Sequence, residues 1–151
     1  MIEEKIKELG IELPSPPTPA GSYIPVVKTG NLLFISGQIP MEKGKVVFSG
    51  KVSDNNLDIA QKSARMCAIN ILAQIKREIG DLDKVSKIVR LSGFVNSSPE
   101  FTQHPKVINA ASDLIFEIFG DKGKHSRIAV GVTSLPLGSM TEIDAIIEIS
   151  I

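Results

Sequence analysis

The side chain best suited to binding a small molecule is Arg127, which stands in a run typical of a β-strand at 126–136. Side chains alternate along a strand, so Arg127 shares one side with two small residues, Ala129 and Gly131. A planar guanidinium with open space beside it is suited to binding a carboxylate through two parallel hydrogen bonds. The run therefore predicts a small-molecule site at Arg127.

Two carboxylates near the C-terminus, Glu142 and Asp144, alternate with other residues and so share one face of a strand. If the last two strands form a hairpin centred on 135–138, Glu142 lies near Gly131 on the face of Arg127. The separation from Arg127 is then about 13 Å along the strand, at ~3.3 Å per residue. A small substrate would fit between the two long side chains. A solvated strand edge is the alternative, because exposed acids are common.

Three residues in the first third of the chain are further candidates. Tyr23, the single tyrosine, follows a Gly-Ser pair and could present its hydroxyl to a ligand, or its ring could pack under the proline-rich segment. Ser36 and Gly37 end a predicted strand, where free backbone N–H groups could receive a carboxylate or polarise a carbonyl. Taken alone, each of these signals is weak.

Several common chemistries find no motif in the sequence. The two histidines, His104 and His125, lack metal-ligand spacing, and the single cysteine, Cys67, lies on an apolar helix stripe as a buried thiol. Glycine-lysine stretches lack the order of a phosphate loop, and no Ser/His/Asp set is recognisable. We expect no metal and no cofactor.

Length and composition bound the class of protein. A chain of 151 residues is expected to form one domain. Seventeen basic and seventeen acidic residues cancel, and aromatics make up 5%, which disfavours nucleic acid as a partner. With no long apolar run, no signal-peptide pattern and a lone cysteine, the sequence predicts a cytoplasmic protein without a membrane span.

Hydrophobic spacing predicts the order ββαβαββ, preceded by a short amphipathic helix and a stiff connector with four prolines. Asp54 is the predicted N-cap of the longest helix, and Gly80 and Gly120 are predicted to end the two long helices. The predicted ranges are helix 1–9, connector 13–19, strand 31–36, returning hairpin strand 45–48, helix 54–79, strand 85–95, helix 101–119, and strands 126–133 and 141–150.

This order predicts an α+β protein, a sheet with two helices packed on one face. Branched residues in the last two strands, Ile128, Val130, Val132 and the run Ile143 to Ile149, are predicted to form one apolar face. The opposite face is predicted to carry Arg127 and the acids of 142–148. Such a face favours packing against other subunits with crevices between them, or plain exposure to solvent.

Taken together, these motifs resemble the RidA/YjgF family, also known as the L-PSP endoribonuclease family, over about residues 16–150. They fall in the family's order, and the chain is similar to a longer subgroup with an N-terminal helical extension. We therefore divide it into a helix and connector at 1–15 and a RidA/YjgF-like domain at 16–151. The matching motifs are Ala20-Gly21-Ser22-Tyr23, Ile35-Ser36-Gly37-Gln38-Ile39-Pro40, Asn109, Ser126-Arg127-Ile128-Ala129-Val130-Gly131-Val132, Leu135-Pro136 and Glu142-Ile143-Asp144-Ala145.

The resemblance implies a chorismate-mutase-like fold and a homotrimer with a cleft between each pair of subunits. It implies hydrolysis of reactive enamines and imines, such as 2-aminoacrylate, to 2-oxo acids and ammonia. Carried onto this sequence, Arg127 binds the substrate carboxylate and Glu142 orients water and relays protons. The substrate-binding positions are Tyr23, Ser36, Gly37, Asn109 and Ala129.

One departure from the family pattern bears on the site. Ala129 stands where the family has a cysteine, which removes a thiol and widens the site, so the physiological imine stays open. A second hypothesis is a cleft that binds small carboxylates such as keto acids without this catalysis. A third is the endoribonuclease or translation-inhibitor activity of some relatives, which the zero net charge disfavours.

Overall fold

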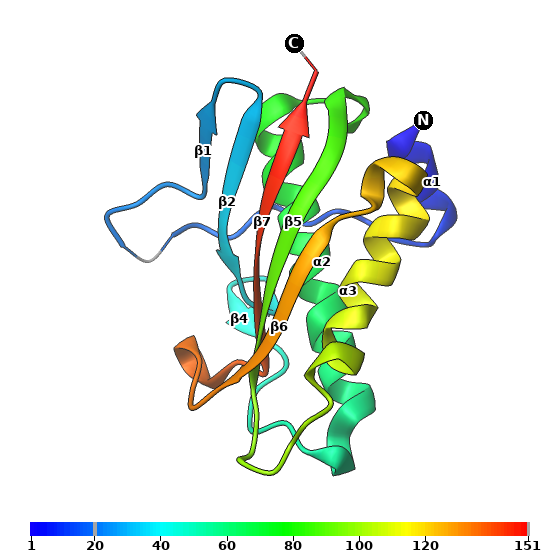
Figure 1. Ribbon diagram of the computed structural model, residues 1–151. Coiled ribbons are helices and arrows are strands. Elements are labelled where there is room, and N and C mark those ends of the chain that lie inside the picture. Colours follow the sequence, from blue (N-terminus) through cyan, green and yellow to red (C-terminus); the bar gives the residue numbers. More distant parts are fainter. Residues whose placement is uncertain (20, 151) are drawn as a thin grey trace.

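The centre of the protein is a five-stranded mixed sheet in the order β1-β2-β7-β5-β6 (Figure 1). The computed structural model describes residues 1–19 and 21–150, so Ala20 of the first motif and Ile151 lie outside the described residues. The strands are β1 (Val26–Thr29), β2 (Leu32–Gln38), β5 (Val85–Asn96), β6 (Ser126–Val132) and β7 (Thr141–Ile149).

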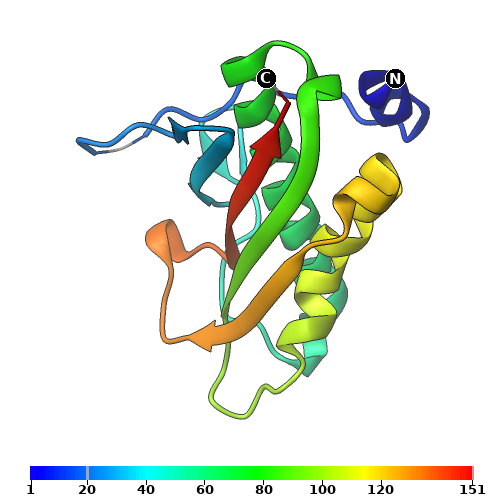
Figure 2. The ribbon, with the colours of Figure 1, turned by 45° about the horizontal axis from the view of Figure 1, so that its top comes forward.

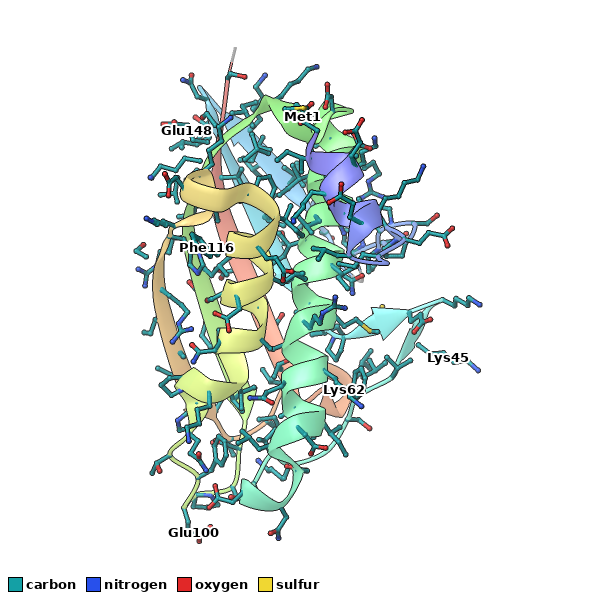
Figure 3. All side chains as sticks on the ribbon, turned by 90° about the vertical axis from the view of Figure 1, so that its right-hand side faces the viewer. Met1, Lys45, Lys62, Glu100, Phe116 and Glu148 are labelled. Atoms are coloured by element: carbon teal, nitrogen blue, oxygen red, sulfur yellow. The ribbon has the colours of Figure 1, made fainter. Side chains whose placement is uncertain are left out.

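Two long helices cover one face of this sheet, as predicted. They are α2 (Leu57–Ile79) and α3 (His104–Phe119), and the side view of Figure 3 shows both on the same side of the strands. Gly80 and Gly120 follow them as C-caps, as expected, since both have positive φ angles that favour glycine. The predicted cap at Asp54 is wrong, because Ser53 caps a 3-10 turn, Asp54–Asn56, that precedes α2.

The predicted hairpin between the last two strands is also wrong. β6 pairs with β5 in parallel, whereas β7 lies between β2 and β5 and is antiparallel to both. Figure 2 shows β5 running between β6 and β7. The connection at 133–140 therefore spans the width of an intervening strand, about 10 Å at ~4.8 Å per strand spacing. A tight hairpin turn could not cover that distance.

This pairing overturns the predicted assignment of faces. Leu91 on β5 is the partner of both Arg127 and Ala145, so those three side chains share the helix-covered face. Phe94 is the partner of both Val130 and Glu142, which share the uncovered face. The branched residues of β6 are therefore not core, and Ile128 remains 41% exposed. The core face is that of Ile143, Ala145, Ile147 and Ile149 on β7, together with α2 and α3.

The small residues beside Arg127 are explained by how closely α3 approaches the sheet. A Cβ added to Gly93 on β5 would lie 2.7 Å from the Ile108 side chain of α3. A Cβ on Gly131 would lie 2.5 Å from His104 Nε2. Ala129 is partly buried and packs against the core. The sequence predicted open space above Ala129 and Gly131, beside Arg127. Much of that space is filled by side chains of α3.

The first hairpin also differs from the prediction. β1 pairs with β2. The sequence did not predict β1, because this strand has only four residues and most of them are exposed. The predicted strand at 45–48 does not return along β2. Instead β4 (Lys45–Val46) pairs with β3 (Met41–Glu42) in a separate two-stranded ribbon.

The predicted N-terminal helix is confirmed as α1 (Ile2–Glu8), and its position is fixed from several sides. Ile6 is buried in the core, and the Ile2 backbone N–H donates to Asp83 Oδ1 at 2.8 Å. Glu3 forms an ion pair with Lys76 of α2. The division of the chain at residue 16 stays a prediction. None of the described helices is long and apolar enough to span a lipid bilayer.

Candidate functional site

Arg127 forms the centre of one group of polar side chains, between β6 and α3. Its Nη1 donates to Asn109 Oδ1 at 2.7 Å and to Ser112 Oγ at 3.2 Å. Both hydrogens of Nη1 are then engaged. Within residues 1–19 and 21–150, Nε and Nη2 make no hydrogen bond, so the side of the guanidinium formed by these two nitrogens is free. That edge has the geometry for a bidentate bond to a carboxylate.

A histidine adds a further link to this group. His125 Nε2 lies 2.9 Å from Ser112 Oγ, and its Nδ1 lies 2.6 Å from the carbonyl oxygen of Gly123. Because a carbonyl only accepts, we assign the ring proton to Nδ1, and Nε2 of the neutral ring then accepts from Ser112. The Ser112 oxygen is thereby free to accept from Arg127. A cavity of about 340 Å³ lies against Ser112, His125 and Arg127.

Sequence reasoning missed Ser112 and left the role of His125 open. Ser112 follows Asn109 by three residues on α3, a spacing that brings two side chains onto one face of a helix. This spacing was a usable signal once Asn109 was a candidate. His125 lies two residues before Arg127, and only the fold brings its ring back to α3.

Glu142 forms the centre of a second group, on the uncovered face of β7. The side chain lies directly over Gly37, where an added Cβ would come within 2.9 Å of the Glu142 Cδ atom. A side chain at position 37 would therefore displace the carboxylate. Partial burial, and to a lesser extent the negative charge of Asp144, raise the pKa of Glu142 above its ordinary value. A carboxyl group with a raised pKa is suited to exchanging protons near neutral pH.

A cavity of about 290 Å³ opens beside this second group, and Tyr23, Ser36, Gly37 and Glu142 all line it. Tyr23 is 54% exposed. Ser36 is tied to its own loop, because its hydroxyl donates to the Ile24 carbonyl at 3.0 Å and its N–H to the Pro25 carbonyl at 2.8 Å. The expectation of a free N–H at Ser36 is therefore wrong.

The predicted site residues thus fall into two separate groups rather than one. Arg127, Asn109 and Ala129 lie along β6 and α3, on the helix-covered side. Ser36 and Gly37 on β2 and Glu142 on β7 line the other cavity, and Tyr23, in the loop before β1, lines it with them. The strand β5 separates the two groups within one chain.

Neither group offers a set of metal ligands. Across residues 1–19 and 21–150, no cluster of three or more His, Cys, Asp and Glu side chains is placed to hold a metal ion. The thiol of Cys67 is buried, with Sγ 3.3 Å from Thr141 Oγ1. Burial raises the pKa of Cys67 to about 12, which keeps it a neutral, unreactive thiol.

The match to known proteins covers almost the whole chain. A family model described as "YjgF/chorismate_mutase-like, putative endoribonuclease" matches residues 3–149. The chain belongs to this YjgF family. Its fold is the YjgF/chorismate-mutase-like fold, so the predicted family and fold class are both confirmed.

Relatives of this YjgF chain carry different descriptions. Protein TCP17 of Trypanosoma cruzi is 40% identical over 151 residues, which cover 99% of this chain and 94% of TCP17. The crystal structure of Atu1372 from Agrobacterium tumefaciens, a protein of unknown function, matches with a TM-score of 0.92 at 47% identity, covering 99% of this chain and 92% of Atu1372. The 2-iminobutanoate/2-iminopropanoate deaminase of Dermatophagoides farinae is 27% identical, covering 92% of this chain and 94% of that enzyme.

Proposed function

We propose that this YjgF protein hydrolyses reactive enamine and imine intermediates that bear a carboxylate, releasing 2-oxo acids and ammonia. The observation that carries the proposal is the Arg127 guanidinium, whose Nη1 is fixed by Asn109 and Ser112 while its Nε/Nη2 edge is free. A planar fork held in one orientation selects planar carboxylates. The relationship to an iminobutanoate deaminase supports the same substrate class.

The active cleft forms between subunits of a homotrimer. Because the Arg127 group and the Glu142 group lie on opposite faces within one chain, a substrate meets both only when one copy's Arg127 faces the next copy's Glu142. Apolar side chains on the uncovered face support such packing, since Phe34 and Ile128 are each 41% exposed there. An isolated copy would hold only half of the site.

In this cleft Arg127 holds the substrate carboxylate and Glu142 activates a water molecule. An enamine first gains a proton on its terminal carbon and loses one from its nitrogen to the solvent, and so becomes the imine. The Glu142 carboxylate accepts a proton from water as the water oxygen bonds to C2 and the C=N π electrons move to nitrogen. Glu142 then returns that proton to the nitrogen, which gives an amino alcohol at C2. The hydroxyl proton of the amino alcohol next passes through the Glu142 carboxylate to the nitrogen, the C–N bond breaks, and ammonia leaves. The electrons of the O–H bond form the second C–O bond, so C2 becomes the carbonyl carbon of the 2-oxo acid.

A coupled assay tests this function. An L-amino-acid oxidase generates the imine in the cuvette, and semicarbazide competes for it, so an imine hydrolase lowers the yield of semicarbazone. We expect wild-type protein to accelerate hydrolysis, and Arg127→Ala to lose on the order of a hundredfold or more in kcat/KM, because two charge-assisted hydrogen bonds disappear. Equal rates for wild type and Arg127→Ala would refute the proposal.

Two alternative functions predict different results in the same experiments. A binding protein without this catalysis would leave the rate of imine hydrolysis unchanged, while 2-oxobutanoate would raise its melting temperature. An endoribonuclease, the activity in the family's description, would cleave RNA. The zero net charge of the chain makes strong phosphate binding unfavourable.

A further inference from the structure

The cavity beside Glu142 is walled mainly by apolar side chains. They come from the proline-rich connector, from the loops around β1 to β3, and from the loop before β7. The principal ones are Pro17, Pro19, Tyr23, Ile39, Met41 and Leu137. Among the described residues that line it, Glu142 is the one charged side chain.

Two glutamines line the same cavity, but their polar atoms are already paired within the protein. Gln74, 1% exposed on α2, donates from Nε2 to the Pro17 carbonyl at 3.0 Å and to Gln38 Oε1 at 3.3 Å. Its Oε1 accepts from Arg77 at 2.8 Å. Gln38 donates in turn to the Ser36 carbonyl at 3.0 Å. These amides are therefore not free to bind a polar ligand.

The same bonds fix the connector as a wall of the cavity. Gln74 holds the connector at Pro17, and α1 is anchored ahead of it through Ile6 in the core and the bond from Ile2 to Asp83. Proline restricts the backbone between these points. Residues 17–19 of the connector thus form one wall of the cavity beside Glu142.

Leu137 stands at the mouth of this cavity in an unusual conformation. Its backbone has φ 56° and ψ 23°, the left-handed region that favours glycine, and its side chain is 72% exposed. The turn is stabilised by Ser139, whose hydroxyl donates to the Pro136 carbonyl at 2.9 Å. A leucine that is both strained and exposed at a cavity edge is explained if its side chain contacts a ligand.

We infer that this cavity binds the side chain of the substrate, and that the preferred imines derive from amino acids with medium-sized apolar side chains, such as leucine or methionine. The inference rests on the proposed function. With the carboxylate on Arg127 and C2 beside the water of Glu142, a substituent on C3 enters the cavity. 2-Aminoacrylate carries no such substituent and would leave the apolar walls in contact with water.

The test compares imines that differ only in their side chain. An L-amino-acid oxidase supplies the imines of alanine, 2-aminobutyrate, norvaline, leucine and glutamate to the wild-type protein, with semicarbazide as competitor. We expect kcat/KM to rise roughly fourfold per added methylene in the apolar series, and to be lowest for the glutamate imine, whose second carboxylate would be buried without a partner. A kcat/KM for the alanine imine equal to or above that for the leucine imine would overturn the inference.

A pair of variants assigns the preference to the cavity. Leu137→Gly removes the side chain and relieves the left-handed strain, so it should fold normally. We expect it to reduce the leucine-to-alanine ratio of kcat/KM about tenfold or more, since one large apolar contact is lost. Ile59→Ala, on the exposed side of α2 and 42% exposed in the wild type, is the matched control and should keep the wild-type ratio. An unchanged ratio in Leu137→Gly would count against the cavity.

Binding measurements separate this inference from the proposed function. If wild-type protein hydrolyses none of the imines, the proposed function fails, and the cavity is then tested with stable 2-oxo acids by calorimetry. Tighter binding of 4-methyl-2-oxopentanoate than of 2-oxobutanoate, lost in Leu137→Gly, would support an apolar side-chain site. Equal affinities, or no binding of either acid, would overturn it.

Discussion

Arg127 and Glu142 project from opposite faces of the same sheet, on strands that β5 separates. Arg127 is hydrogen-bonded to α3 on the covered face, and Glu142 lies over Gly37 on the uncovered face. The relationship means that one chain cannot enclose a small substrate between these two side chains.

Mixed oligomers test whether two copies complete one site. Arg127→Ala and Glu142→Gln should each be nearly inactive alone. Co-expressed and assembled at random, they should regain activity in about one cleft in four, where an intact Arg127 from one copy meets an intact Glu142 from the next. The measurement is the imine-hydrolysis rate of purified mixed oligomers.

The control for this experiment is the Arg127→Ala/Glu142→Gln double variant mixed with wild-type chains. It should form no cleft from complementary halves, so its activity should track the fraction of wild-type pairs. Failure of the two single variants to complement each other, in oligomers shown to be mixed, would argue for a site within one chain.

The pH dependence of kcat/KM should report the raised pKa of Glu142. Only the carboxylate can accept a proton from water, so activity should rise with pH along an acidic limb whose pKa lies above the ordinary value of a glutamate. In Asp144→Asn a neighbouring negative charge disappears, ionisation of Glu142 becomes easier, and the limb should move to lower pH. The pKa of this limb should still lie above the ordinary value of a glutamate, because burial is the larger cause of the raised pKa of Glu142. If the acidic limb has the same pKa in Asp144→Asn as in the wild type, it reports the ionisation of a group other than Glu142.

The raised pKa of Glu142 should also make the stability of the fold depend on pH, in the direction opposite to the activity. Between the ordinary and the raised pKa of Glu142, the folded protein holds a proton that the unfolded chain has released, so the free energy of unfolding falls as pH rises through this interval. Glu142→Gln removes that dependence. We expect the variant to gain stability relative to wild type above the interval and not below it, as measured by urea denaturation at both pH values.

Ser112 should act as a positioning residue for Arg127. In Ser112→Ala, Nη1 of Arg127 loses one of its two acceptors, and Nε2 of His125 loses its hydrogen-bond partner. Because the carboxylate is bound in both the ground and the transition state, KM should rise about tenfold, as expected for a lost hydrogen bond to a charged group, with little change in kcat. Steady-state kinetics measure both parameters.

A nearby serine provides the control for that variant. Ser126→Ala removes an exposed hydroxyl that donates to the Val89 carbonyl and does not contact the guanidinium. It should keep the wild-type KM. If Ser112→Ala instead lowers kcat and leaves KM unchanged, Ser112 takes part in the chemistry rather than in orienting Arg127.

Gly37 should be required for the position of the Glu142 carboxylate. In Gly37→Ala the new methyl group overlaps that carboxylate and must displace it. A shift of about 1 Å in a catalytic group can cost on the order of a hundredfold in rate, so kcat should fall by that order. The melting temperature should change little, since the displaced side chain faces a cavity. An unchanged kcat in Gly37→Ala would show that the Glu142 carboxylate does not act from this position.

Local patterns predicted much of the fold correctly. The apolar stripe and Gly80 identified α2, Gly120 marked the end of α3, and the run at 85–95 identified β5, because these features depend on residues a few positions apart. The motifs around Arg127 and Glu142 also indicated the family correctly. Ser112 escaped because serine on a helix has many structural roles, and it is chemically informative only beside a guanidinium.

What the sequence alone determined is which side chains alternate along each strand, so that Arg127 shares a side with Ala129, and Glu142 with Asp144. Which face of the sheet each set occupies was decided only by the tertiary structure. The physical reason is that the register between two strands decides which of their side chains lie on the same face of the sheet. Here that register is set through Leu91 and Phe94 of the intervening strand β5. That pairing is non-local, and it placed Arg127 and Glu142 apart where a simple hairpin would have joined them.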